Sequence, residues 1–350
     1  MFLKLAVLRP ELDVVAVNDL GDINNLAYLL KYDTAYGKSD LDISVKDGNL
    51  VVNGKQIAFI SEKDPAMLPW GKLDADVVVE STGFFESYEK ASSHLQAGAK
   101  RVVITAPAKG NPRTERAEQS SYDGNPRTER AEQSSYDGDP TLGKTVLMGI
   151  NEDELQSCKV TSNGSCTTNA VSPVAKIMSE TIGVKKAVLN TVHGYTATQK
   201  LVDSPDAKDW RRGRSGAQNI VPSSTGAAIS VMEAVKNLSG LFDGLAMRVP
   251  VITGSIVDFT FVAARPTSVE EVNSILKHAA KEERWSKVFS VTEEQFVSSD
   301  IIGAPYASIA DLSFTKVIDG DLVKILIWYD NEAGYTNALV EHVIKSGKLA

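Results

Sequence analysis

A cysteine lies among hydroxyl-bearing residues in the segment SNGSCTTNA, residues 162–170. The preceding residues, KVTSN, predict a strand, Gly164 predicts a tight turn, and a helix is predicted to begin at Cys166. The positive end of a helix dipole and its free N–H groups favour a thiolate, so we expect a lowered pKa for Cys166. The hydroxyls of Ser165 and Thr167 would suit an oxyanion or a phosphate.

A reactive thiol needs a base, and His193 is the best candidate among the four histidines. It closes the predicted strand VLNTVH and precedes the hydroxyl-rich loop GYTATQK. His94 lies in a predicted helix, while His278 and His342 lie in charged helical stretches and are expected to be solvated surface residues. From these residues alone, a buried cysteine and a packed histidine would be the commoner explanation of Cys166 and His193.

Anion-binding side chains follow the candidate pair along the chain. RRGR, residues 211–214, has three guanidinium groups, and SSTGAA, residues 223–228, has hydroxyls and a glycine before a predicted helix. Arg248 lies in the apolar stretch AMRVP, and a buried arginine usually meets an anion. Each feature alone could be an ion pair or a helix cap. Together they predict a substrate that carries phosphate.

The composition excludes several classes of protein. The 350 residues, 43% of them hydrophobic, are enough for two domains with sizeable cores. A net charge of −8 argues against a general nucleic-acid binder. No apolar run approaches the ~20 residues of a membrane span, and MFLKLAVLRP does not resemble a secretion signal, so we expect a cytoplasmic protein. Two cysteines make no disulfide framework, and no His/Cys cluster suggests a metal.

The order of predicted elements indicates an α/β protein. In the first half, hairpin turns are expected at Asp47-Gly48 and Asn53-Gly54, with strands at 14–18, 77–80, 102–105, 145–150 and 159–163 and helices at 23–32 and 88–97. This alternation favours a doubly wound parallel sheet. The second half suggests a mixed sheet with helices, from strands at 187–193, 256–264 and 322–328 and helices at 269–280 and 337–346.

One segment has no counterpart in this pattern. Residues 111–124 read NPRTERAEQSSYDG, and residues 125–138 repeat them without a change. Because the repeat is polar and has almost nothing to bury, a solvated surface loop is expected. An added partner-binding loop is the alternative.

The motifs together resemble one family. SNGSCTTN, HGYTATQ, RRGRSGAQNIVPSSTGAA, LAMRVP and WYDNEAGY, in this order, resemble phosphorylating glyceraldehyde-3-phosphate dehydrogenase, and VVAVND, ESTGFF and ITAPAKG resemble its cofactor-domain segments. The resemblance implies a Rossmann-type parallel sheet plus a mixed-sheet α+β catalytic domain. It places the NAD-binding domain at residues 1–165, with the repeat 111–138 inserted and helix 332–350 completing it, and the catalytic domain at residues 166–331.

The resemblance also implies a reaction. Cys166 would attack glyceraldehyde 3-phosphate, hydride would pass to NAD, and inorganic phosphate would cleave the resulting thioester to an acyl phosphate, as in glycolysis. His193 would be the acid–base residue, and the protein would be a homotetramer. An erythrose-4-phosphate dehydrogenase is the alternative within the same chemistry, and a catalytically impaired homologue that acts as a binding protein is an alternative of another class.

Roles for further residues come only from the resemblance. Thr196 and Arg248 match the site for the substrate phosphate. The site for the attacking phosphate is matched by Ser165, Thr167, Arg212, Thr225 and Gly226. The residues that match cofactor contacts are Asp19 for the ribose, Lys63 and Thr105 for the lining of the site, and Asn331 and Tyr335 for the nicotinamide.

The beginning of the chain departs from the family pattern. MFLKLAV matches the segment after the family's first strand and glycine-rich phosphate loop, and the first glycine here is Gly21. Without that loop we expect weak NAD binding, and the activity of the chain as it stands is left open. A start assigned too far downstream and a true truncation are both consistent with this departure.

Overall fold

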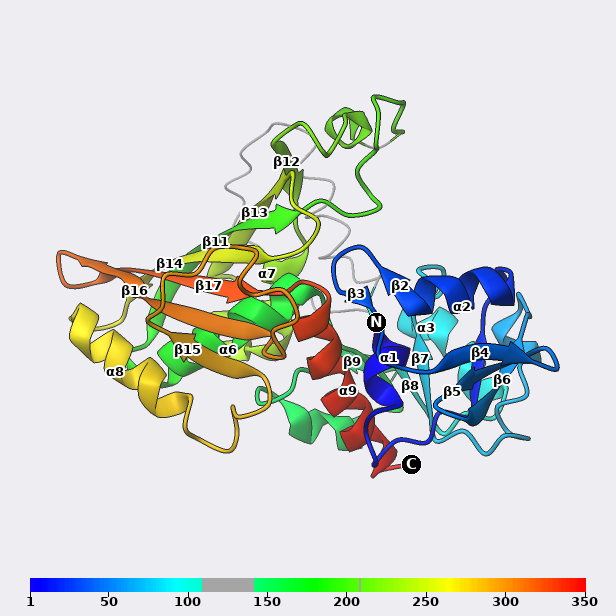
Figure 1. Cartoon of the computed structure of the whole chain (residues 1–350). Helices are drawn as coiled ribbons and strands as arrows, with labels where there is room; N and C mark the ends of the chain where they lie inside the picture. The colour runs from blue at the N-terminus through cyan, green and yellow to red at the C-terminus, as the bar shows by residue number, and fades with distance from the viewer. Residues whose placement is uncertain (109–141, 208) are drawn as a thin grey trace.

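A computed structural model describes residues 1–108, 142–207 and 209–350, so the duplicated segment, residues 111–138, lies outside the described residues. Figure 1 shows two lobes, one formed by the first strands and the other by a large sheet with its helices. Helices α1 (Phe2–Ala6) and α9 (Ala333–Gly347) lie between the lobes and contact each other. No helix of the described residues is long and apolar enough to cross a bilayer.

The first lobe begins with a four-stranded sheet of order β1-β6-β5-β4. Its strands are β1 (Ala16–Asn18), β4 (Ile43–Lys46), β5 (Asn49–Val52) and β6 (Lys55–Ile60). The two predicted hairpins are confirmed. Asp47 and Gly48 have φ of 49° and 72°, and Asn53 and Gly54 have φ of 50° and 79°, the left-handed pair that a type I′ turn requires.

A second four-stranded sheet is parallel throughout, with the order β7-β8-β10-β9. It consists of β7 (Val77–Glu80), β8 (Arg101–Ile104), β9 (Gly143–Thr145) and β10 (Val160–Ser162). The predicted parallel sheet is therefore confirmed. The carboxyl end of β10 leads directly to Cys166.

Two predicted elements of this lobe were wrong in extent. The strand expected at 145–150 ends at Thr145, because a turn follows in which Ile150 N–H donates to Leu147 O and Gly149 has φ of 77°. The helix expected at 88–97 is two short helices, α3 (Tyr88–Ala91) and α4 (Ser93–Gln96). The other elements of the lobe are α2 (Ile23–Lys31), β2 (Tyr32–Asp33), β3 (Gly37–Lys38) and a 3₁₀ turn, Pro65–Met67.

The C-terminal helix α9 packs on the parallel sheet. Leu339 and Val343 form a buried cluster with Val103 of β8, against which Phe2 of α1 also packs. The C-terminal helix therefore packs on a sheet formed by residues of the first half of the chain. Helix α9 also contacts α6 (Cys166–Thr181).

The second lobe is built on a seven-stranded mixed sheet of order β12-β13-β11-β14-β17-β16-β15. Its strands are β11 (Val184–Gly194), β12 (Val221–Ser224), β13 (Phe242–Val249), β14 (Ser255–Ala263), β15 (Phe289–Thr292), β16 (Ser308–Ile318) and β17 (Leu322–Tyr329). Every second residue of β14 is buried, as expected when one face of a sheet is covered. The mixed sheet predicted for this half is confirmed.

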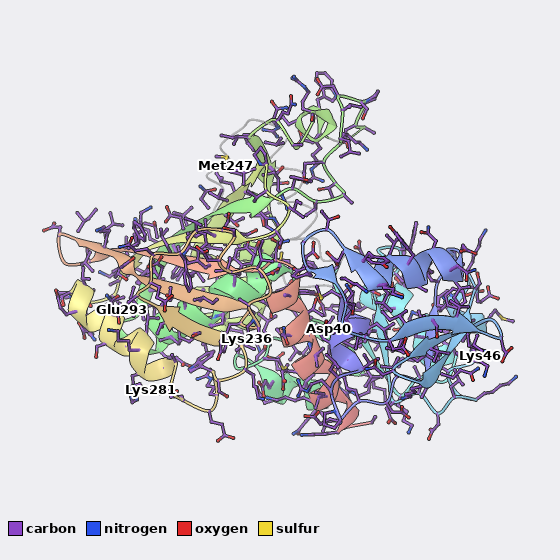
Figure 2. All side chains as sticks on the ribbon, viewed as in Figure 1. Asp40, Lys46, Lys236, Met247, Lys281 and Glu293 are labelled. Atoms are coloured by element: carbon purple, nitrogen blue, oxygen red, sulfur yellow. The ribbon has the colours of Figure 1, made fainter. Side chains whose placement is uncertain are left out.

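Helices α6, α7 (Ala227–Ala234) and α8 (Val269–Ala279) share one large apolar core with the buried residues of this sheet. Side chains extend from the sheet all along its length, and Figure 2 labels Met247 on β13, next to Arg248 in the sequence. The core fixes α6 against β17 and β11, so the start of α6 has a defined place relative to the ends of those strands. The 3₁₀ turns Trp210–Gly213 and Lys236–Leu238 belong to this lobe, and the 3₁₀ turn Glu152–Ser157 lies between β9 and β10.

Candidate active site

Cys166 is the first residue of α6, as the sequence predicts. Gly164 has φ of 62°, which turns the chain sharply after β10. Ser165 caps the helix, its Oγ accepting a hydrogen bond of 3.1 Å from the backbone N–H of Thr168. The Asn169 amide donates to the carbonyls of Asn163 and Ser165 at 2.7 and 3.0 Å, so the turn before the cysteine is tied to the helix that comes after it.

His193 lies at the end of β11 with its Nε2 atom 3.3 Å from Sγ of Cys166. The side chain is buried and its ring packs edge-on against Tyr329, with the ring centroids 5.9 Å apart. The pairing of β11 with β13 places Arg248 directly beside His193. The predicted pairing of Cys166 with His193 is thus matched by the geometry.

Two contacts compete for Nδ1 of His193, which lies 2.7 Å from Gly194 O and 2.7 Å from Nη1 of Arg248. Only the tautomer with the proton on Nδ1 leaves a lone pair on Nε2 to accept the proton of Cys166. In that tautomer Nδ1 donates to Gly194 O, which also accepts from Arg248 Nη1 at 3.2 Å. The contact with Gly194 O fits this ring state, whereas the guanidinium of Arg248 is a donor and its contact with Nδ1 fits the tautomer with the proton on Nε2.

The expectation of a lowered pKa for Cys166 is wrong. Burial raises the pKa of the Cys166 thiol and outweighs the opposing effects of Arg248 and of the N–H groups at the start of α6. Burial, followed by the positive charge of Arg248, lowers the pKa of His193 to about 3. The directions of both pKa shifts favour a thiol beside a neutral imidazole in the resting pair.

Tyr329 is a site residue to which the sequence motifs assign no role. It is buried, and its hydroxyl lies 2.9 Å from Oγ1 of Thr167 and 2.7 Å from Oγ1 of Thr191. The hydroxyl of Thr167 is thereby engaged inside the protein. A tyrosine at the end of an apolar strand, directly before the polar residues DNE, is the signal that the sequence offers for it.

The residues predicted to bind anions leave polar atoms unsatisfied. Among the described residues, Nε of Arg212, Nε of Arg248 and Oγ of Ser223 are buried and have no hydrogen-bond partner. The charge of Arg212 contributes to lowering the pKa of Arg248, so the two guanidinium groups lie within range of each other. Buried N–H donors on neighbouring cations are the arrangement that binds an anion.

Two more of the predicted anion-site residues frame the start of α7. Gly226 is its N-cap, and Oγ1 of Thr225 accepts a hydrogen bond of 3.2 Å from Ala227 N–H. Both follow β12, which pairs with the strand of Arg248. Thr196 lies in the turn after His193, where its hydroxyl is 2.9 Å from that of Thr198. Among the described residues, no hydrogen bond joins these three residues to Cys166.

Asn331 and Tyr335 are connected by hydrogen bonds to the residues beside His193 and Cys166. Oδ1 of Asn331 accepts a hydrogen bond of 2.9 Å from Ser255 Oγ, which in turn accepts from Gly194 N–H at 3.2 Å. The hydroxyl of Tyr335 donates to Gly164 O at 3.2 Å, two residues before Cys166. These hydrogen bonds connect Asn331 to the residue after His193 and Tyr335 to the turn before Cys166.

The other predicted cofactor residues lie at carboxyl ends of parallel strands, where ligands of such sheets bind. Asp19 follows β1 and is exposed, with Oδ1 accepting from Gly21 N–H at 2.8 Å. The backbone N–H and carbonyl of Glu62 form hydrogen bonds with the side-chain amide of Asn18, the last residue of β1. Lys63 is the next residue and is exposed, so Lys63 lies beside the end of β1. Thr105 follows β8.

These residues fit the two ends of a dinucleotide: a carboxylate for ribose hydroxyls near β1, and amide and phenol groups near Cys166. Residues 1–20 contain no glycine. The contacts to the pyrophosphate are therefore not provided by a glycine-rich loop within residues 1–20.

The remaining histidines differ in burial. His278 is exposed as expected, but the surface position expected for His342 is wrong, because His342 is fully buried. His94 is also buried, with Nε2 2.9 Å from Glu80 Oε2 and Nδ1 accepting from Trp70 Nε1 at 3.0 Å. Among the described residues, neither His94 nor His342 forms a hydrogen bond with Cys166.

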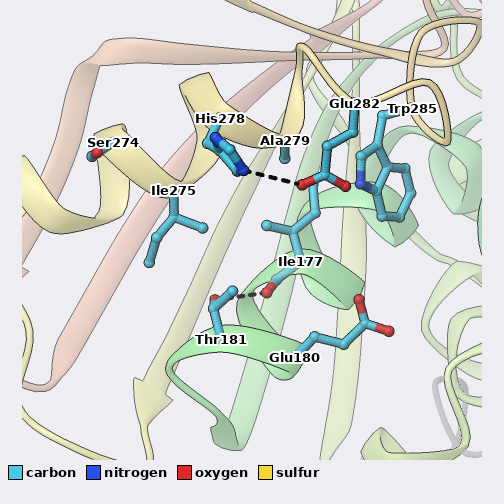
Figure 3. A pocket seen from close by; sticks show the side chains of 9 residues that line it. All are labelled: Ile177, Glu180, Thr181, Ser274, Ile275, His278, Ala279, Glu282 and Trp285. Carbon is cyan, nitrogen blue, oxygen red and sulfur yellow. Dashed lines mark hydrogen bonds and ion pairs between the residues drawn. The ribbon is translucent and has the colours of Figure 1, made fainter.

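A separate pocket of about 360 Å³ lies between the C-terminal part of α6 and α8 (Figure 3). Its lining includes Ile177, Thr181 and His278, and His278 points toward Glu282. Because α6 rises ~1.5 Å per residue, the pocket lies ~17–22 Å along the helix from Cys166. None of the predicted site residues lines it.

Comparison with known proteins agrees with this arrangement. Residues 1–88 match the family model for the glyceraldehyde 3-phosphate dehydrogenase NAD binding domain, and residues 165–331 match that for the C-terminal domain. The chain is 41% identical to glyceraldehyde-3-phosphate dehydrogenase of Clostridium pasteurianum, over 97% of this chain and 93% of the relative. It is 42% identical to that of Geobacillus stearothermophilus, over 97% and 92% of the two chains. The chain therefore belongs to the glyceraldehyde-3-phosphate dehydrogenase family.

Proposed function

We propose that the chain is a phosphorylating glyceraldehyde-3-phosphate dehydrogenase of glycolysis, which converts glyceraldehyde 3-phosphate, NAD and inorganic phosphate to an acyl phosphate and NADH. The observation that carries the proposal is the separation of 3.3 Å between Cys166 Sγ and His193 Nε2, with the half-buried Arg248 beside the ring. A thiol, a neutral base and a cation next to each other suit attack on a phosphorylated aldehyde.

The thiol begins the reaction. Cys166 Sγ bonds to the aldehyde carbon while Nε2 of His193 takes the thiol proton, which then neutralises the aldehyde oxygen to give a thiohemiacetal. Oxidation removes a hydride from carbon and a proton from the hydroxyl, and His193 accepts that proton as the thioester forms. When bound, NAD supplies the hydride acceptor.

The second half of the reaction transfers the acyl group. An oxygen of inorganic phosphate attacks the thioester carbon, the carbon–sulfur bond breaks, and Cys166 Sγ leaves with the proton that His193 holds. Phosphate must compete with water at this step, so it needs a built site rather than random encounter. The buried and unpaired Nε–H donor of Arg212 supports such a site.

We assign the two anion sites as the family resemblance implies. Thr196 and Arg248 take the phosphate of the aldehyde. Inorganic phosphate is assigned to Ser165, Thr167, Arg212, Thr225 and Gly226, with Thr167 contributing through its backbone because its hydroxyl is bonded to Tyr329.

For the cofactor, Asp19 is assigned to the ribose, Lys63 and Thr105 to the lining of the site, and Asn331 and Tyr335 to the nicotinamide. We divide the chain accordingly into a cofactor domain, residues 1–165 with helix 332–350, and a catalytic domain, residues 166–331. The packing of α9 on β7 and β8 supports that division.

We also propose a homotetramer in the cytoplasm. Leu201, Val202 and Trp210 are 82%, 73% and 86% exposed, which is unusual for large apolar side chains that lie near one another in sequence. Light scattering coupled to gel filtration tests this: four chains per particle are expected, and a monomer at micromolar concentration would refute it.

The activity is tested by NADH absorbance with glyceraldehyde 3-phosphate in the presence and absence of phosphate. We expect phosphate-dependent turnover that is lost in Cys166→Ser. A higher kcat/KM for erythrose 4-phosphate would assign the alternative substrate. Turnover that does not depend on phosphate would refute the phosphorylating reaction.

A further inference from the structure

His342 is a buried histidine of α9 that contacts the segment leading to Cys166. Its Nδ1 atom lies 3.0 Å from Oδ1 of Asn163, and its Nε2 atom lies 2.9 Å from Oγ1 of Thr161. Because a carboxamide oxygen only accepts hydrogen bonds, Nδ1 donates to Asn163, and the Thr161 hydroxyl donates to Nε2. Burial, with a contribution from the charge of Arg101, lowers the pKa of His342 to about 3, so the ring stays neutral.

One face of α9 contacts the residues at the end of β10. Thr161 and Asn163 are two residues apart in extended chain, so their side chains lie on the same side, toward His342. Tyr335 precedes His342 by about two helical turns and lies on the same face of α9. Its hydroxyl donates to Gly164 O at 3.2 Å. The helix thus holds the strand end and the following turn at separate points.

The segment that α9 holds sets the position of the thiol. Asn163 is itself fully buried, and its carbonyl accepts from the Asn169 amide at 2.7 Å. Gly164 then turns the chain with φ of 62°, and Ser165 caps the helix whose first residue is Cys166. A shift of the Asn163 carboxamide is therefore transmitted over only a few residues to the sulfur.

We propose that His342 is a positioning residue for the thiol: by fixing the Asn163 carboxamide, it maintains the 3.3 Å separation between Cys166 Sγ and His193 Nε2. His342 does not touch the reacting atoms and acts through Asn163. Its effect on turnover rests on the proposed function, whereas its effect on the reactivity of the thiol does not.

Removing both hydrogen bonds should disturb the turn rather than the anion sites. In His342→Leu the Asn163 oxygen and the Thr161 hydroxyl lose their buried partners, and regaining partners requires side-chain movement. Because a misplacement of ~1 Å can cost ~100-fold in rate, kcat should fall. The KM for the aldehyde should stay unchanged, because Arg248 is held by β13 and not by α9.

The test is the rate at which iodoacetamide alkylates Cys166 at a fixed neutral pH, with the adduct located by mass spectrometry. His342→Asn places an amide N–H near the position of Nδ1, whereas His342→Gln reaches the position of Nε2. We expect alkylation about tenfold slower in His342→Leu, a rate within about threefold of wild type in His342→Asn, and no rescue in His342→Gln. His193→Asn gives the rate expected when no base is present.

His278→Leu is the matched control, because it makes the same substitution at an exposed histidine and should leave the rate unchanged. Urea midpoints show which variants are folded. If His342→Leu does not fold, the comparison of His342→Asn with His342→Gln decides. An unchanged or faster rate in folded His342→Leu, or equal rates in the Asn and Gln variants, would overturn the proposal. Lack of NAD reduction by wild type would refute the proposed function while the alkylation rates still test His342.

Discussion

Nε2 of His193 lies 3.3 Å from Sγ of Cys166, although the two atoms come from the end of a strand and the start of a helix in different layers of the fold. Neither group is charged at rest, because burial raises the pKa of the thiol and lowers the pKa of the imidazole to about 3. Under the proposed function, one proton passes from Sγ of Cys166 to Nε2 of His193 when a substrate is attacked.

Replacing the nucleophile should abolish the reaction. In Cys166→Ser, kcat for NAD reduction should fall by at least ~10³-fold, since a hydroxyl is a far weaker nucleophile than a thiol and forms no thioester. Cys158→Ser is the matched control, because Cys158 is a buried cysteine outside the contact with His193. Equal losses of activity in the two variants would argue for a structural effect.

Removing the base should slow both the reaction and the labelling of the thiol. In His193→Asn, kcat should fall by roughly 10²–10⁴-fold, the usual contribution of general acid–base catalysis. Because no group then accepts the proton of Cys166, alkylation by iodoacetamide should slow as well. A variant with normal alkylation and slow turnover would place His193 only in the later steps.

The half-buried cation of Arg248 should select the phosphorylated substrate. Arg248→Met should lower kcat/KM for glyceraldehyde 3-phosphate by about 10- to 100-fold, the loss of one or two hydrogen bonds to a charged group. Unphosphorylated glyceraldehyde should be affected far less. Arg211→Met provides the control, since Arg211 is half exposed and pairs with Asp209. A similar loss with both aldehydes would remove Arg248 from phosphate recognition.

The pH dependence of labelling should follow a thiol with a raised pKa. The alkylation rate of Cys166 should keep rising from about pH 6 to about pH 9, because the free thiolate, which reacts faster than the thiol that gives its proton to His193, forms only as pH approaches the raised pKa. A plateau from about pH 6 upward would instead indicate a stable thiolate–imidazolium pair. That outcome would contradict the neutral resting state.

Acid should destabilise the fold through its buried histidines. His193 and His342 both have a pKa of about 3 when folded, against an ordinary value of 6.5, so the unfolded chain binds more protons between these values. Their contribution to stability is complete above ~pH 6.5 and is lost as pH falls toward ~3. The urea midpoint should therefore drop from about pH 7 to about pH 5, and less steeply in His342→Asn. An equal slope in that variant would contradict the role of His342.

The sequence predicted the local features of this protein well. The hairpins at Asp47-Gly48 and Asn53-Gly54 need only the φ preferences of their residues, and the start of α6 at Cys166 needs only a strand, a glycine and a capping serine. The Cys–His pair was also predicted, because each residue follows a clear strand.

Properties that depend on packing between distant segments were not predictable in the same way. The pKa of Cys166 depends on burial by the second lobe, which outweighs the local helix dipole. His342 has charged neighbours in sequence, such as Glu341, yet faces β10, and periodicity does not say which strand a helix will cover. The role of Tyr329 depends likewise on Thr167 and Thr191, which are far from it along the chain.

The central claim is that Cys166 forms a thioester that inorganic phosphate releases. Rapid mixing of the protein with saturating NAD and glyceraldehyde 3-phosphate tests it most directly, with NADH absorbance and intact mass followed together. Without phosphate, we predict a burst of about one NADH per active chain and an acyl adduct on Cys166, and phosphate should then remove the adduct and start turnover. A burst that persists in Cys166→Ser, or sustained turnover without phosphate, would contradict the claim.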